Sequence, residues 1–150
     1  MDKPLPDTTQ IFFTQAQKHL LLFMERADLS EQVKQELQPG VERLEIHTTR
    51  QTALNALRTT VNRQILLEDC PAGQEILAEI ATWPGSIRRF THLVVLGERG
   101  TSQDTVLAFT LGIDTYIHVQ ELKALRTLFE QSQKRFLYRT RLWLQEGGVL

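Results

Sequence analysis

Short apolar runs alternate with stretches of helical periodicity along most of this chain. Continuous apolar runs are typical of strands buried on both faces, whereas apolar residues that recur every three or four positions indicate helices with one buried face. The runs predict five strands, at residues 10–14, 41–47, 65–67, 92–96 and 113–119. Because each predicted strand is followed by a predicted helix, we expect an α/β fold with a single doubly wound, mainly parallel five-stranded sheet and helices on both faces.

The segment between the first two predicted strands contains the longest apolar cluster of the chain. We place its residues Leu20, Leu21, Phe23 and Met24 on a first helix, because their spacing is compatible with helical periodicity. This helix is expected to end at Pro39–Gly40, where proline and glycine stop it.

The last predicted helix is long, because residues 120–145 contain no proline or glycine. A helix of about 25 residues spans about 38 Å, which exceeds the length needed to cover one domain of this size. Its a/d-like stripe consists of Leu122, Leu125, Phe129, Ser132, Phe136, Arg139 and Trp143. We therefore expect the second half to pack against the extended first helix or against a second chain. The predicted organisation is an N-terminal lead at 1–9, an α/β domain at 10–129 and a C-terminal helix extension and tail at 130–150.

Length and composition limit the function classes. A chain of 150 residues has the size of one domain. Its 17 basic and 18 acidic residues argue against a dedicated nucleic-acid binder, which needs a strongly basic face. The single cysteine, Cys70, excludes an intramolecular disulfide and suits a reducing cytoplasm. No stretch approaches the roughly 18 apolar residues of a membrane span, so we expect a cytoplasmic protein without a membrane partner.

The run from Ala108 to Ile117, A-F-T-L-G-I-D-T-Y-I, resembles the "A-x-x-x-G-A-D-x-Y-L" run of bacterial response-regulator receiver domains. The resemblance extends loosely over residues 10–129, where only the order and length of the elements match. In receivers, two acidic residues after the first strand hold magnesium, and an aspartate after the third strand accepts the phosphoryl group. A hydroxyl residue and a lysine complete that site, because the metal and the lysine neutralise the phosphoryl charge during transfer.

The acidic positions of the receiver site are altered here. With a first strand at 10–14, the metal-binding acids are replaced by Thr14 and Gln15, which are neutral. The position of the phosphoryl acceptor falls on Glu68, with Asp69 beside it. Glu68 is either a permanent imitation of the activated state or an ordinary acid at a strand end, and Asp69 could be an unconventional acceptor.

The remaining positions of the receiver site are altered as well. The hydroxyl position falls on Gly97 and the lysine position on Val119, so neither group is present. Tyr116 aligns with the aromatic residue that moves between buried and exposed positions in receivers. We favour a Tyr116 that packs at the sheet edge with its hydroxyl in water, because its coupling partner is missing. The resemblance therefore implies a degenerate receiver, or pseudo-receiver, that is no enzyme.

Other chemistry finds little support in the sequence. The four histidines, His19, His47, His92 and His118, show no metal-ligand spacing, and we expect structural roles for them. Cys70 follows two acids, which should raise its pKa. No glycine-rich phosphate loop and no G-x-S-x-G element occurs. We predict no metal and no cofactor.

The predicted function is that of a protein–protein interaction or scaffold module in bacterial signalling, with a homodimer formed through the final helix. Aromatic anchors flanked by arginine are favoured at protein interfaces. The candidate partner-binding residues are Tyr116, Phe129, Phe136, Arg139 and Trp143. Two alternatives stay open: a module that senses a small ligand at the carboxyl edge of the sheet, near Thr14, Glu68, Gly97 and His118, and an atypical phosphorylated regulator.

Overall fold

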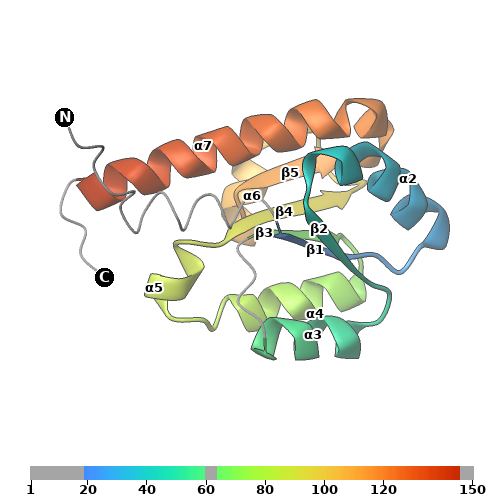
Figure 1. Ribbon diagram of the computed structural model, residues 1–150, viewed down its shortest axis with the longest axis horizontal. Helices are drawn as coiled ribbons and strands as arrows, with labels where there is room; N and C mark the ends of the chain where they lie inside the picture. Colours follow the sequence, from blue (N-terminus) through green and yellow to red (C-terminus); the bar gives the residue numbers. More distant parts are fainter. Residues whose placement is uncertain (1–18, 60–63, 146–150) are drawn as a thin grey trace, which may run out of the picture.

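Five parallel strands form one sheet in the computed structural model, which describes residues 19–59 and 64–145, with side chains described up to residue 142. The strands are β1 His19–Phe23, β2 Arg43–His47, β3 Gln64–Glu68, β4 His92–Gly97 and β5 Thr115–His118. Their order is β2-β1-β3-β4-β5, and every adjacent pair is parallel (Figure 1). The predicted doubly wound α/β fold with a five-stranded sheet is confirmed.

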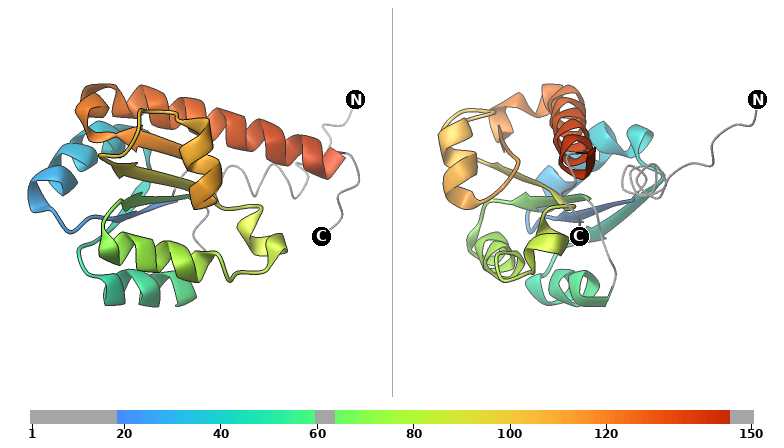
Figure 2. Two further views of the ribbon diagram at one scale, coloured as in Figure 1. Left: turned by 180° about the vertical axis from the view of Figure 1, so that it is seen from behind. Right: turned by 90° about the vertical axis from the view of Figure 1, so that its left-hand side faces the viewer.

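Helices cover both faces of this sheet, as Figure 2 shows in the view along the strands. The helices are α2 Ala27–Leu37, η1 Gln38–Gly40, α3 Arg50–Thr59, α4 Pro71–Ile80, α5 Gly85–Arg88, α6 Thr105–Leu111, η2 Val119–Ala124 and α7 Leu125–Gln145. Helices α2 and α7 pack on one face, and α3 and α4 on the other (Figure 1). The short helix α5 was not anticipated from the sequence. None of the described helices combines the length and the apolarity that a membrane crossing requires.

The helix predicted over Leu20–Met24 is wrong, because this segment forms β1 and the residue that follows it. Strand β1 lies between β2 and β3, and Leu20 through Met24 are fully buried. A strand with helices on both faces needs apolar side chains in both directions, and such a run imitates the apolar cluster of a buried helix. The strand predicted at 10–14 lies outside the described residues, as do residues 1–9 and the rest of the lead up to residue 18.

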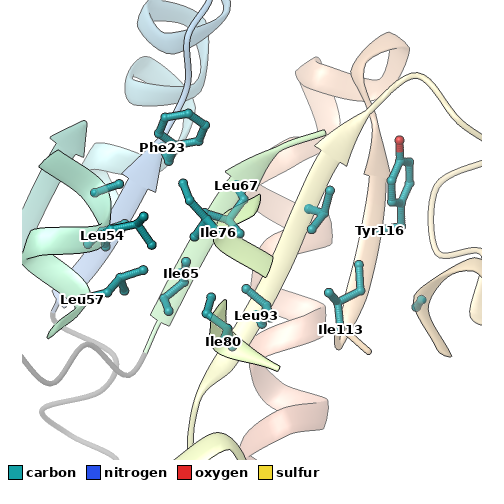
Figure 3. Packing of buried hydrophobic residues seen from close by; sticks show 14 residues of the cluster. Phe23, Leu54, Leu57, Ile65, Leu67, Ile76, Ile80, Leu93, Ile113 and Tyr116 are labelled. Carbon is teal, nitrogen blue, oxygen red and sulfur yellow. The ribbon is translucent and has the colours of Figure 1, made fainter. Parts of the chain in front are cut away.

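Two apolar cores, one on each side of the sheet, hold the layers together. The core between the sheet and helices α3 and α4 contains residues that point alternately from the strands, such as Ile65 and Leu67, with Ile76 and Ile80 from α4 (Figure 3). The other core joins Leu66 and its neighbours to α2 and α7. Because a buried side chain of this size contributes about 1.5–3 kcal/mol, the two cores fix the positions of the strand ends.

Helix α6 is bounded by two local signals. Asp104 caps its first turn, because its carboxylate accepts the backbone N–H of Leu107 at 3.0 Å. Gly112 ends the helix with a φ of 70°, a left-handed conformation that glycine adopts without strain. The ends of α6 thereby set where β5 begins.

Helix α7 runs without a break past residues 129 and 130, where the sequence suggested a domain boundary. Phe136 from its second half is 2% exposed and packs against the ring of His92, with 5.2 Å between the ring centroids. His92 also contacts Ser132 Oγ through Nε2 at 2.8 Å. This part of α7 therefore packs on the same sheet as its first half.

Candidate functional site at the carboxyl edge of the sheet

The carboxyl ends of β1, β3, β4 and β5 meet at an open cleft of about 410 Å³. Its walls come from the loops after β1, β3 and β4 and from the first residue after β5. In open parallel sheets, ligands bind at this edge. The lining side chains that carry charge are Arg26, Glu68, Asp69, Glu98 and Arg99.

The residues after β1 differ from those expected. Thr14 and Gln15 lie outside the described residues, and Met24, Glu25 and Arg26 follow the strand instead. Met24 is fully buried in the core, and Glu25 and Arg26 are exposed. The loop therefore offers one carboxylate next to a guanidinium. Among the described residues, no group of three or more His, Cys, Asp or Glu side chains is placed to hold a metal ion.

Glu68 occupies the end of β3 and is 7% exposed. Its Oε1 accepts the backbone N–H groups of Glu25 at 3.1 Å and of Arg26 at 3.2 Å. Both hydrogen bonds tie the β1–α2 loop to β3. Of the two interpretations that the sequence left open, these contacts favour a structural acid at a strand end.

The carboxylate of Asp69 accepts four side-chain hydrogen bonds in the cleft. Its carboxylate accepts Arg99 Nε at 2.7 Å and Nη2 at 3.0 Å, the Tyr116 hydroxyl at 2.7 Å and Gln74 Nε2 at 3.3 Å. Burial alone would raise the pKa of Asp69, but the hydrogen bonds from Arg99, Tyr116 and Gln74 lower it below its ordinary value. Asp69 is therefore a carboxylate whose oxygens are already engaged.

Tyr116 is fully buried, so the expectation that its hydroxyl lies in water is wrong. Its ring packs in the core and its hydroxyl points toward the carboxyl ends of the strands (Figure 3). The hydroxyl donates to Asp69 and accepts the backbone N–H of Arg99 at 2.9 Å. Burial, together with the carboxylate of Asp69, raises the pKa of Tyr116 to about 12. We call Asp69, Arg99 and Tyr116 the Asp–Arg–Tyr cluster.

Gly97 leaves the space that this cluster occupies. A Cβ at position 97 would overlap the hydroxyl of Tyr116 and the Cβ of Asp69. A threonine or serine, as receivers have here, would require Tyr116 to move. The inward position of Tyr116 therefore depends on a glycine at position 97.

The end of β5 carries no cation into the cleft. Val119, at the lysine position, is half-buried and lines the cleft with an apolar side chain. His118 caps the turn that follows, because its Nδ1 accepts the backbone N–H of Gln120 at 3.1 Å. This agrees with the structural role expected for that histidine.

Cys70 lies at the start of α4, where its Sγ accepts the backbone N–H of Gly73 at 3.4 Å. Burial, the nearby charge of Glu68 and that of Glu25 raise the pKa of the thiol, as the sequence predicted. A Cβ at Gly73 would overlap the carbonyl oxygen of Glu68, so a glycine is needed for this short loop.

The candidate partner-binding residues are separated by the fold. Tyr116, Phe129 and Phe136 are 0%, 4% and 2% exposed and contribute to the chain's own core, which corrects their assignment to a partner surface. Phe129 and Phe136 were chosen as aromatic anchors, but a helix that covers a sheet buries its a/d stripe against that sheet. Tyr116 lies in β5, inside the core. Arg139 is exposed and pairs with Asp114, and the side chain of Trp143 lies outside the described residues.

Sequence reasoning missed Arg99, Gln74 and Arg26. A usable signal was present, because Arg99 follows β4 by two residues and β4 is the sheet neighbour of β3. Loops at the ends of adjacent parallel strands lie on the same edge, so Arg99 was within reach of Asp69.

Known proteins support the fold assignment through their structures alone. No family model matches this sequence, and no curated protein matches it. A CheY-like response-regulator receiver domain from Methanospirillum hungatei JF-1 is 17% identical, with 81% of this chain and 98% of that chain covered and a TM-score of 0.63. An orphan response regulator of H. pylori is 18% identical, with 79% and 98% covered and a TM-score of 0.60. The non-phosphorylated HemR receiver domain from Leptospira biflexa is 21% identical, with 77% and 94% covered and a TM-score of 0.61.

All three structures are receiver domains or response regulators, and each is covered over most of its length. The match includes the parallel sheet that places the carboxyl-edge cleft. This chain has the fold of a CheY-like response-regulator receiver domain.

Proposed function

We propose that this chain is a non-catalytic signalling module of the cytoplasm, a pseudo-receiver that binds protein partners and is not switched by phosphorylation. One observation carries the proposal: the Asp–Arg–Tyr cluster fills the place where phosphotransfer would occur. Asp69 already has four donors within 3.3 Å. A carboxylate with both oxygens engaged is a poor nucleophile toward a phosphoryl donor.

Electrostatics support the same conclusion. Phosphoryl transfer needs positive charge at the oxygens of the transferring group. The two arginines of the cleft are each paired with carboxylates, Arg99 with Asp69 and Arg26 with Asp28 and Glu98. The lysine position holds Val119, so a phosphoryl group would enter a cleft whose cations are already neutralised.

The direct test is exposure to a phosphoryl donor. The protein is incubated with acetyl phosphate and Mg²⁺, and its intact mass is measured beside a receiver domain that has a complete site. We expect no phosphoryl adduct on this chain. An adduct that disappears in the Asp69→Asn variant would overturn the proposal and make the chain an atypical phosphorylated regulator.

We further propose that the partner is a second copy of the chain, bound through the outer side of α7. Tyr138 is 66% exposed and Leu142 is 37% exposed, and both lie in the second half of this helix. Arg139 and Arg141 lie between these two residues in the sequence, and interfaces favour aromatic residues together with arginine. In a two-fold dimer both copies use the same patch, so each copy would cover the exposed Tyr138 and Leu142 of the other.

Light scattering tests this self-association. The wild-type protein should give twice the chain mass of 17.3 kDa, and Tyr138→Asp should give the mass of one chain. Phe109→Asp is the matched control, because Phe109 is 87% exposed on a different helix, α6. A wild-type monomer at high concentration, or a dimer broken by the Phe109 change alone, would refute an interface on α7.

The size of the cleft favours a second candidate function, the binding of a small ligand. Its 410 Å³ is within the range of small-molecule sites, and it is lined by both charged and apolar groups such as Arg26 and Leu29. A thermal-shift screen separates the two functions, because a cleft ligand should raise the melting temperature of the wild type and lose this effect in Arg26→Gln.

A further inference from the structure

A second cavity lies at the opposite edge of the sheet, where the strands begin. It has a volume of about 390 Å³ and is formed between α5, the turn before β5 and the second half of α7. Both α5 and the last turns of α7 lie at this end in Figures 1 and 2. The lining residues are Gly85, Arg88, Arg89, Ile113, Asp114 and Arg139. Three guanidinium groups thus face one carboxylate.

Asp114, the one carboxylate among the described residues that line this cavity, already accepts several donors. Asp114 Oδ1 accepts Arg139 Nη2 at 2.5 Å, and its Oδ2 accepts the backbone N–H of Leu93 at 2.8 Å. Arg88 Nη2 is 3.8 Å from the same Oδ2. Among the described residues, Asp114 therefore lies beside the guanidinium groups of Arg88 and Arg139, and these three side chains together carry a net positive charge.

Arg88 is held in place before any ligand arrives. Its Nη1 donates to the carbonyl oxygen of Thr91 and its Nη2 to that of Gly112, both at 2.8 Å. Its side chain is 25% exposed, and burial together with the charge of Arg139 lowers its pKa. A half-buried guanidinium that is already oriented loses little entropy when it binds an anion.

We propose that this cavity binds the doubly charged oxyanion of a small molecule, a phosphate or polycarboxylate group, between Arg88 and Arg139. The planar fork of a guanidinium group matches two oxygens of such an oxyanion through paired N–H donors. Arg139 is 63% exposed and can turn from Asp114 toward the ligand. The site is independent of the carboxyl-edge cleft, since it is built from different residues at the other edge of the sheet.

Titration at low ionic strength tests the proposal, because screening weakens exposed charge pairs. Pyrophosphate, inorganic phosphate and citrate are titrated separately into the full chain and followed by calorimetry and by amide NMR shifts. We expect saturable binding of pyrophosphate or citrate, and the tighter of the two assigns the ligand to phosphates or to carboxylates. The amide signals of residues 85–89 and 112–114 should move, while those of 97–99 should not.

Two variants of exposed arginines on α7 give the matched comparison. Arg139→Gln should weaken binding by about tenfold or more, because one hydrogen bond to a charged group is lost. Arg126→Gln should leave the dissociation constant unchanged within about twofold, because Arg126 is 50% exposed and pairs with Glu130 away from the cavity. No saturable binding of any probe, equal affinity in Arg139→Gln, or shifts confined to residues 97–99 would each overturn the site.

Discussion

Replacing His92 by glutamine should flatten the dependence of stability on pH between about pH 6.5 and pH 4. His92 is fully buried between the rings of Phe129 and Phe136 and contacts Ser132. Burial lowers its pKa from 6.5 to about 4; the charge of Asp114 opposes this shift, and the charges of Arg139, Arg88 and Arg135 add to it. In the unfolded chain the same imidazole takes up a proton near pH 6.5.

The sign follows from the number of protons bound in each state. Between these two values the unfolded chain holds the additional proton, so the free energy of unfolding falls as the pH falls. With 6.5 for the unfolded and about 4 for the folded chain, the loss from pH 8 to pH 5 is about 2 kcal/mol. Since domains of this size are stable by about 5–15 kcal/mol, the effect is measurable.

The assay is urea unfolding at a series of pH values, followed by circular dichroism. The wild type should lose about 2 kcal/mol between pH 8 and pH 5, and His92→Gln should lose less than half as much. Some dependence will remain, because burial also lowers the pKa of His19. Glutamine removes ring packing as well, so the variant should be weaker at every pH, and the informative quantity is the slope. Equal slopes in the two proteins would refute this reasoning.

Three further predictions test the site and the core. Gly97→Ala should lower the free energy of unfolding by about 1–3 kcal/mol, because the new Cβ overlaps Tyr116 and Asp69. Urea unfolding should find almost no loss for the control Gly85→Ala, whose Cβ would meet only the end of Arg89 at 3.9 Å. Arg99→Gln should cost about 1–2 kcal/mol by removing two donors from the buried carboxylate of Asp69, and an unchanged urea midpoint would contradict the importance of the Asp–Arg–Tyr cluster. Phe136→Ala should cost about 3–5 kcal/mol, whereas Phe109→Ala, the same change at an exposed position on α6, should cost less than about 0.5 kcal/mol in the same thermal and urea melts.

Local patterns sufficed for most elements of the fold. The alternation of runs predicted β2 to β5 within a few residues and a helix after each of them, although α5 was not anticipated. The error at β1 had a physical cause, because Leu20–Met24 is apolar on every side and periodicity cannot separate a buried strand from a buried helix. Because of that error, the positions of the metal-binding acids were expected about ten residues too early, at Thr14 and Gln15. The residues that follow β1 are Met24 and Glu25.

The contacts of the site depend on tertiary structure that the sequence pattern does not contain. Asp69 and Arg99 are separated by 30 positions and meet because β3 and β4 are neighbours. Asp114 and Arg139 meet because α7 turns back along the sheet, and the a/d stripe of that helix had assigned Arg139 to a partner surface. On the proposed function, Gly97 and Val119 were informative on their own, because neither side chain supplies a hydroxyl or a cation.

The residues at the carboxyl edge of the sheet depend on one another through their contacts. Gly97 gives Tyr116 room to lie inward, the inward hydroxyl bonds Asp69, and Arg99 neutralises the carboxylate that would otherwise be buried with only neutral donors. Removing any one of these groups leaves an unpaired charge, a void or an overlap. On the proposed function, β5 and the adjoining α6 are therefore held in one arrangement, and regulation would have to enter through the amount of protein, its partner or a ligand at another site.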